Sequence, residues 1–106
     1  MDRANKIKDE ANLLVKQGEQ EKACEKYFEA INTLRFSEKF KNTKEGKSAE
    51  MACRLNIALC KQTLGDYSAV VDQCERVLTH EPSNWKAQFR LSQALYSLIK
   101  DKDDKI

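Results

Sequence analysis

Apolar residues recur at every third or fourth position along almost the whole chain, which is the spacing of one face of an α-helix. No stretch alternates apolar and polar residues with the period of a β-strand. The recurring positions form five groups, of which the first is Ile7, Ala11 and Leu14 and the last is Ala87, Leu91, Ala94, Leu95 and Leu98. The pattern predicts five helices and an all-α fold.

Breaks in this pattern separate the predicted helices. Gly18 and Gly65 each follow a helical segment, and the polar stretch NTKEGKS separates the second segment from the third. Pro82 stops the fourth segment, after which Ser83 or Asn84 can cap the next helix. The short connections predict helices paired as antiparallel hairpins.

The sequence repeats itself with a fixed offset. The segment KQGEQEKACEKYFEAI (16–31) aligns with TLGDYSAVVDQCERVL (63–78), so that Gly18 matches Gly65 and later apolar positions match one another. An internal repeat of this kind indicates a stacked helical array.

The repeat units have unequal lengths. The second unit spans 51–84 and is 34 residues long, which is the length of a tetratricopeptide repeat. The first unit, 4–50, is longer because of an insertion at 35–50, and a partial third unit covers 85–100. We therefore expect residues 1–106 to form one tetratricopeptide-repeat α-solenoid of about two and a half repeats, with a concave groove lined by the first helix of each unit.

Composition narrows the classes of function. Nineteen basic and 17 acidic residues give a net charge of +2, which falls short of the clustered positive charge of a nucleic-acid binder. No apolar run is long enough to cross a bilayer, and the first ten residues lack the apolar stretch of a secretory signal. We expect a cytoplasmic protein that binds neither nucleic acid nor membrane.

Cysteine spacing gives no metal or redox signature. The chain has no C-x-x-C motif and a single histidine, His80, which has no recognisable catalytic partners. We expect no metal, no cofactor and no catalytic residue, and four buried, reduced thiols: Cys24, Cys53, Cys60 and Cys74.

Five polar residues stand out on the first helices of the three units. Lys8 and Asn12 lie four residues apart, Asn56 follows in the second unit, and Lys86 and Arg90 again lie four residues apart. Like charges at this helical spacing repel, so an acid from outside the helix is expected. Ammonium, guanidinium and amide donors suit a pair of carboxylates, and the alternative for Asn56 is a bond to a neighbouring helix.

These residues carry a family resemblance. They lie in KDEAN (8–12), NIALCKQTLGDY (56–67) and EPSNWKAQFR (81–90), which together resemble the carboxylate-clamp tetratricopeptide domains of chaperone adaptors. The resemblance implies that the five residues grip the C-terminal carboxylate and the last Asp side chain of an acidic tail of the Glu-Glu-Val-Asp type. Such tails end the cytosolic heat-shock chaperones of the ninety- and seventy-kilodalton classes.

Within that family the chain is most similar to the large immunophilins of the FK506-binding type. In those proteins a peptidyl-prolyl isomerase domain precedes the repeats. The resemblance implies a co-chaperone adaptor that is not itself an enzyme, and that could be the non-catalytic segment of a longer isomerase.

Further residues are candidates for contacts with the side chains of a bound peptide, namely Leu59, Phe89 and Gln93. Trp85, Phe89 and Tyr96 are expected to pack in the core or in an interface, and the alternative is that they form an apolar wall beside the peptide. The lysines at 39, 41, 44 and 47 are expected to be a solvated junction, with contact to an acidic partner as the alternative.

A structural scaffold is the alternative function. The last helix has no second helix after it in this sequence, so its apolar face would lack a cover. Self-association as a homodimer, or docking of another protein, would then use the third-repeat face formed by Leu91, Leu95 and Leu98.

Overall fold

The computed structural model describes the backbone of residues 2–104 and the side chains of residues 3–100. Five helices and no strand are present in that part of the chain, which confirms the all-α prediction. The helices are α1 (Asp2–Lys16), α2 (Gln20–Phe36), α3 (Lys44–Thr63), α4 (Tyr67–His80) and α5 (Trp85–Asp104).

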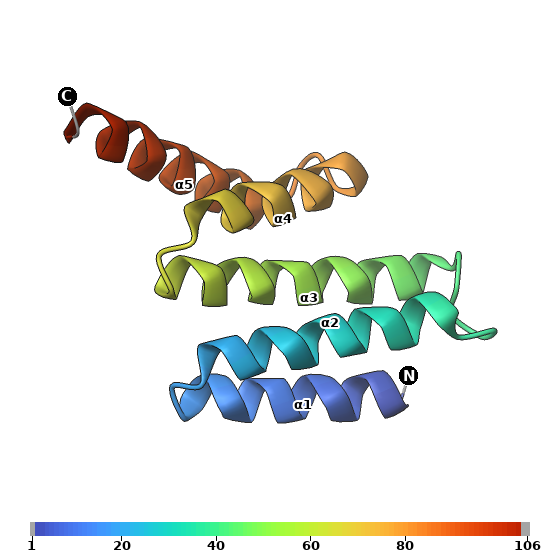
Figure 1. The fold of residues 1–106 in the computed structure, drawn as a ribbon. Helices are drawn as coiled ribbons and strands as arrows, with labels where there is room; N and C mark the ends of the chain where they lie inside the picture. The colour runs from blue at the N-terminus through green and yellow to red at the C-terminus, as the bar shows by residue number, and fades with distance from the viewer. Residues whose placement is uncertain (1, 105–106) are drawn as a thin grey trace.

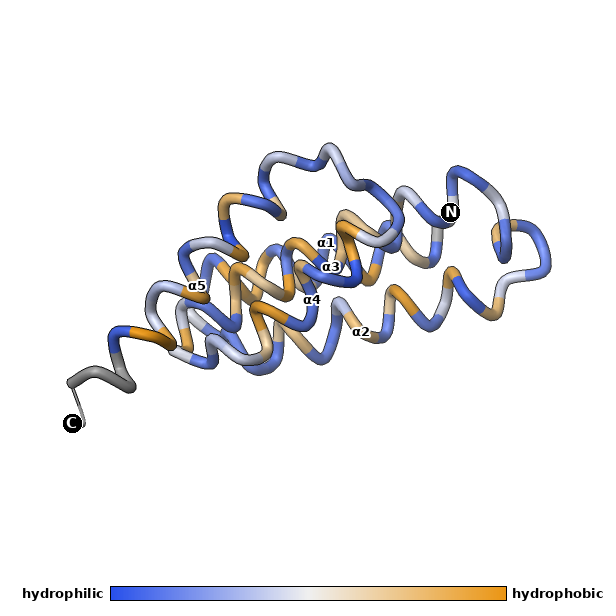
Figure 2. The backbone as a smooth tube through the Cα atoms, turned by 90° about the horizontal axis from the view of Figure 1, so that it is seen from above, coloured by the Kyte–Doolittle hydropathy of each residue, from blue (hydrophilic) through white to orange (hydrophobic). Residues whose placement is uncertain are grey.

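Successive helices run in opposite directions and stack into an elongated array (Figure 1). Each helix packs against the next one along the chain, and α5 also touches α3. The Cα atoms span 51 × 32 × 18 Å, so the array is flat as well as long. In Figure 2, seen from above, α1 and α3 overlap and α2 lies to one side of them. Helices α1 and α3 therefore lie in one layer, beside α2.

The predicted breaks fall where the helices end. Gly18 and Gly65 follow α1 and α3 with φ angles of 80° and 78°, a left-handed conformation that glycine adopts without steric cost. Asn84 caps α5, because its Oδ1 accepts a hydrogen bond of 3.1 Å from the backbone N–H of Ala87. Of the two candidate caps, Asn84 is the one that bonds the helix.

The segment expected to be an insertion is divided between two helices and a linker. Helix α2 continues to Phe36, and α3 already begins at Lys44, so only residues 37–43 connect them. The longer first unit therefore arises from a short linker together with extended helix ends.

The linker packs tightly against the start of α3. Thr43 caps the helix, with its Oγ1 accepting a hydrogen bond of 3.0 Å from the N–H of Gly46. A Cβ atom on Gly46 would lie 2.2 Å from the carbonyl oxygen of Phe40. Glycine at this position lets the linker backbone approach the helix.

Buried apolar residues fill the space between neighbouring helices. Small residues lie fully buried where the two helices of each hairpin meet, as predicted: Ala23, Ala30, Val70 and Val77. The four cysteines are free and buried, which also confirms the prediction. The largest cluster joins α1, α2 and α3, so this cluster fixes the spacing of the first and second repeats.

The aromatic residues of α5 depart from the expectation of core packing. Trp85, Phe89 and Tyr96 are 68%, 58% and 68% exposed, and that part of the expectation is wrong. Leu91 instead packs against the cluster between α3 and α4, while Leu95 is 44% exposed. Helical spacing identified apolar positions on α5 but not which of them have a neighbouring helix.

Candidate functional site

Lys8 and Asn12 lie on α1 beside the residues that anchor this helix. Ile7 and Ala11 are buried against the core, which leaves Lys8 half-buried and Asn12 exposed. Burial raises the pKa of the Cys53 thiol, and the positive charge of Lys8 opposes this shift. Cys53 belongs to α3, so the positive charge of Lys8 acts on a thiol of that helix.

The Asn12 side chain is hydrogen-bonded by a buried residue of the neighbouring helix. The hydroxyl of Tyr27 on α2, a residue only 2% exposed, donates a hydrogen bond to Asn12 Oδ1. Burial raises the pKa of Tyr27 to about 12, so the phenol is neutral at physiological pH and remains a donor. One end of the Asn12 amide is thereby attached to the core.

Asn56 lies half-buried in the middle of α3. None of the side-chain hydrogen bonds within residues 3–100 engages its amide. The alternative interpretation, that Asn56 bonds a neighbouring helix, therefore has no hydrogen bond in its support. Leu59, on the next turn, is 41% exposed and is open to a ligand.

Lys86 and Arg90 extend from α5, which Ala87 anchors by its complete burial. Arg90 is half-buried, and its Nη1 donates a hydrogen bond of 3.4 Å to Oε1 of Gln62 at the end of α3. Lys86 is exposed, with its Nζ 5.9 Å from the centroid of the Trp85 ring. The Arg90 bond ties the positive charge of α5 to α3.

The site cations have no carboxylate partner within 4.0 Å in the part of the chain whose side chains are described. The ion pairs found there use other cations: Lys26, Lys41, Lys47, Arg54 and Arg76. Lys8, Lys86 and Arg90 thus contribute positive charge that no acid of these residues neutralises by contact. Arg90 is joined to α3 through Gln62, and residues 3–100 show no hydrogen bond between Asn56 and either Lys8 or Arg90.

Gln93 borders a hollow next to the Arg90 bond. This hollow, of ≈ 390 Å³, is lined by Gln62, Tyr67, Ser92, Gln93, Tyr96 and Ser97. Gln62, which bonds Arg90, and Tyr27, which bonds Asn12, were missed by sequence reasoning. Both residues bond to a side chain of another helix, and the spacing of residues along the sequence does not predict such a contact.

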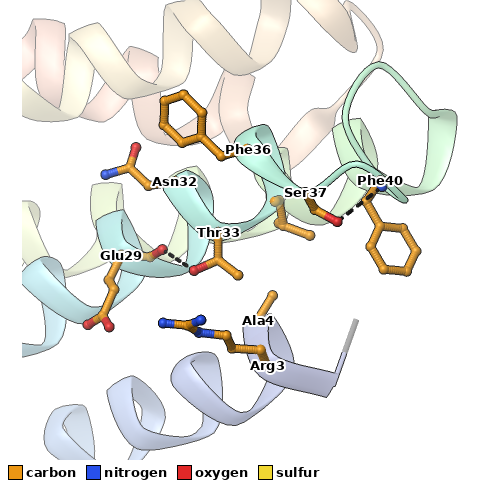
Figure 3. A pocket seen from close by; sticks show the side chains of 9 residues that line it. Arg3, Ala4, Glu29, Asn32, Thr33, Phe36, Ser37 and Phe40 are labelled. Carbon is orange, nitrogen blue, oxygen red and sulfur yellow. Dashed lines mark hydrogen bonds between the residues drawn. The ribbon is translucent and has the colours of Figure 1, made fainter.

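A larger cavity of ≈ 550 Å³ lies elsewhere, between the start of α1, the end of α2 and the linker (Figure 3). Arg3 lies on the α1 side of it and Phe40 on the linker side. Thr33 donates to the carbonyl of Glu29 at 2.9 Å, which satisfies its hydroxyl within α2. None of the five candidate clamp residues lines this cavity.

Among the helices described, none combines the length and apolar character needed to span a bilayer. Likewise, residues 3–100 bring together no group of three or more metal-binding side chains.

Comparisons with known proteins identify relatives among isomerases and co-chaperones. No family model matches the chain. It is 35% identical over 97 residues to the peptidyl-prolyl cis-trans isomerase FKBP42 of Arabidopsis thaliana, covering 86% of this chain and 26% of that protein. It is 26% identical over 90 residues to the human isomerase FKBP4, covering 83% of this chain and 20% of FKBP4.

A third relative and a solved structure complete the comparison. The chain is 28% identical over 98 residues to the Hsp70/Hsp90 co-chaperone CNS1 of Saccharomyces cerevisiae, covering 82% of this chain and 26% of CNS1. The C-terminal TPR-containing domain of a Plasmodium falciparum FK506-binding protein matches with a TM-score of 0.74 and 32% identity, covering 86% of this chain and 62% of that one. The chain thus spans about a quarter or less of the length of the three curated relatives.

Proposed function

Because the chain is a tetratricopeptide-repeat domain similar to that of an FK506-binding protein, we propose that it is a non-catalytic adaptor for heat-shock chaperones. Its ligand is the acidic C-terminal tail, of the Glu-Glu-Val-Asp type, of a chaperone of the ninety- or seventy-kilodalton class. The proposal includes a cytoplasmic location, because the chaperones bound by the carboxylate-clamp family are cytosolic.

The five clamp residues bind the final Asp of the tail from three different helices. Lys8 and Asn12 approach from α1, Asn56 from α3, and Lys86 and Arg90 from α5. A C-terminal Asp carries a main-chain and a side-chain carboxylate, so two negative charges meet three positive ones. Each charge-assisted hydrogen bond contributes about 1.5–3 kcal/mol before the entropy of ordering the tail is subtracted.

One observation carries the proposal. Arg90 is half-buried and bonded to a neutral partner, Gln62, rather than to an acid, whereas the buried Arg54 is paired with the carboxylate of Glu50. A partly desolvated guanidinium without a carboxylate favours an incoming anion. Lys8, also half-buried and without an acid contact, adds to this preference.

Leu59, Phe89 and Gln93 supply the proposed contacts with the rest of the tail. Leu59 and Phe89 are 41% and 58% exposed, which leaves apolar surface for a valine or methionine side chain. Gln93 borders the hollow beside Arg90 and offers both a donor and an acceptor.

Calorimetry with a Met-Glu-Glu-Val-Asp peptide tests the proposal. We expect a Kd of about micromolar for the free carboxylate and a loss of at least about tenfold for the C-terminally amidated peptide. Lys8→Ala and Arg90→Glu should abolish measurable binding with unchanged helix content. Lys22→Ala is the matched control, because Lys22 is an exposed cation of α2, a helix that carries none of the five clamp residues. Equal weak binding of both peptides would contradict the proposal.

A second candidate function follows from the exposed residues of α5. Four large apolar residues of α5 are 58–68% exposed: Trp85, Phe89, Tyr96 and Ile99. With Ser92 between Phe89 and Tyr96, these positions follow one another in steps of four and three residues. This is the spacing of a helix seam, and a second copy of the chain could cover it. Figures 1 and 2 both show the C-terminal half of α5 extending past the other helices.

Light scattering across a concentration series separates the two candidates. Self-association through α5 predicts a rising apparent mass that Tyr96→Lys together with Ile99→Lys removes. The same double variant leaves all five clamp residues in place. A constant monomer mass in the wild type would exclude the scaffold function by self-association.

A further inference from the structure

The hydrogen bond from Tyr27 to Asn12 joins the core to the groove. Tyr27 is 2% exposed and Asn12 is exposed, so the bond crosses from the interior to the surface within one contact. We propose that Tyr27 is a positioning residue, whose hydroxyl holds Asn12 Oδ1 so that the Asn12 Nδ2 group faces the ligand carboxylate as a donor. This inference rests on the proposed function.

The orientation of an asparagine amide matters because its two ends differ. Nδ2 donates hydrogen bonds and Oδ1 only accepts them, and a half-turn about the terminal torsion exchanges the two. With Oδ1 toward the groove, Asn12 would repel a carboxylate; with Nδ2 toward it, the same residue would bind. Within residues 3–100, the Tyr27 hydroxyl is the group that bonds the Asn12 side chain.

Tyr27 is suited to fixing the amide in the donor-outward orientation. Its ring packs in the cluster shared by α1, α2 and α3, together with Cys24, Cys53 and Cys60. Burial raises the pKa of Tyr27 and of these three thiols, so all four groups stay neutral at physiological pH. The phenol therefore keeps its proton and donates a hydrogen bond to Oδ1, and no ionised thiolate competes for that hydrogen bond.

The rigidity of this arrangement reduces the cost of binding. An exposed amide normally loses rotational freedom when it orders on a ligand. Asn12 is already restrained by Tyr27, so part of that loss has occurred during folding. Tyr27 thereby acts on the ligand only through Asn12, and its effect should vanish when Asn12 is removed.

A double-mutant cycle measures this dependence. We expect Tyr27→Phe to weaken the free-carboxylate Met-Glu-Glu-Val-Asp peptide by about fivefold, since one neutral hydrogen bond is lost. In an Asn12→Ala background, Tyr27→Phe should cause no further loss. Asn12→Asp keeps the acceptor for Tyr27 but removes the donor, and it should abolish measurable binding.

Controls separate positioning from packing. Thr33→Val removes another hydroxyl of α2, bonded within its own helix, and should leave affinity unchanged. Circular dichroism verifies that each variant is folded at the temperature used. The inference is overturned if Tyr27→Phe binds as the wild type does, or if it weakens binding equally with and without Asn12. Failure of the wild type to prefer the free carboxylate would instead overturn the proposed function, and the inference with it.

Discussion

Arg54 on α3 and Gln73 on α4 are joined by a buried hydrogen bond of 3.0 Å, and the same guanidinium pairs with Glu50 at 3.1 Å. Both side chains of the ion pair are 7% exposed. The contact ties the two helices of the second repeat together through a single arginine. None of the five clamp residues takes part in the contact, which serves the stability of the array.

Removal of Arg54 should therefore be costly. Arg54→Ala leaves the buried Glu50 carboxylate with only the longer contact to Lys47, at 3.9 Å, and removes the donor that bonds Gln73, so we expect a loss of about 3–5 kcal/mol in the free energy of unfolding. Urea denaturation followed by circular dichroism measures it. Arg76→Ala, which breaks the exposed pair with Asp72, is the control and should cost no more than about 1 kcal/mol. Similar losses in both variants would contradict a special role for the buried pair.

Gly46→Ala tests the close approach of the linker to α3. Gly46 lies in the first turn of α3, where alanine is favoured over glycine by at most about 1 kcal/mol, so a small gain is expected if space is available. The Phe40 carbonyl oxygen fills that space, and we expect a net loss of about 1–3 kcal/mol in unfolding free energy instead.

Gly18→Ala provides a comparison with a different physical cause. No atom lies within 4 Å of the position of its added Cβ, but φ is +80°. Its expected loss of about 1 kcal/mol comes from backbone strain alone. A stabilised Gly46→Ala variant in the same denaturation assay would show that the linker moves aside.

Alkaline pH should destabilise the chain. Burial raises the pKa of Cys60 from 9.0 to about 12 and that of Tyr27 from 10.0 to about 12. Between pH 9 and 12 the unfolded chain therefore loses protons that the folded chain retains, and unfolding becomes easier as pH rises. Each group contributes at most about 1.4 kcal/mol per pH unit, and neither contributes below pH 8.

Urea denaturation between pH 7 and 10.5, with a reductant present, measures this dependence. Cys60→Ala lowers stability at every pH through lost packing but should flatten the decline above pH 9. A decline as steep as that of the wild type would assign the effect to other groups.

Arg90→Lys should separate geometry from charge at the clamp. Lysine retains the positive charge but lacks the planar fork of donors, so we expect about tenfold weaker binding of the free-carboxylate peptide by calorimetry. Arg76→Lys, on α4, is the matched control and should bind as the wild type does. Higher salt should weaken the wild-type complex, since Coulomb attraction at a partly exposed site is screened.

Much of the fold could be predicted from the sequence because the repeat is local in its chemistry. Gly18 and Gly65 end helices by a backbone conformation that glycine favours, and buried Ala23 and Val70 follow at matching positions. The start of α3 at Lys44 was less apparent, because polar residues around it carry no apolar face. The start of this helix is marked by the cap from Thr43, a hydrogen bond that exists only once the backbone is folded.

The sequence suggests candidate residues for the site, but not the residues that bond to them. The clamp candidates came from repeat phase and residue type, which the sequence carries. Tyr27 beneath Asn12 and Gln62 beside Arg90 depend on which helices touch, a tertiary property. The exposure of Trp85 and Tyr96 has the same origin, because a helical pattern cannot reveal a missing neighbour.

The order of contacts along the array also governs how the chain folds and opens. Helix packing within the described chain is almost entirely between sequential neighbours, with α3 against α5 as the added contact. Few distant segments must meet before stabilising contacts form, which favours rapid folding from any hairpin. Opening should accordingly proceed from the ends inward, so backbone amides of α5 should exchange with solvent deuterium earlier than those of α3, which has neighbours on both sides.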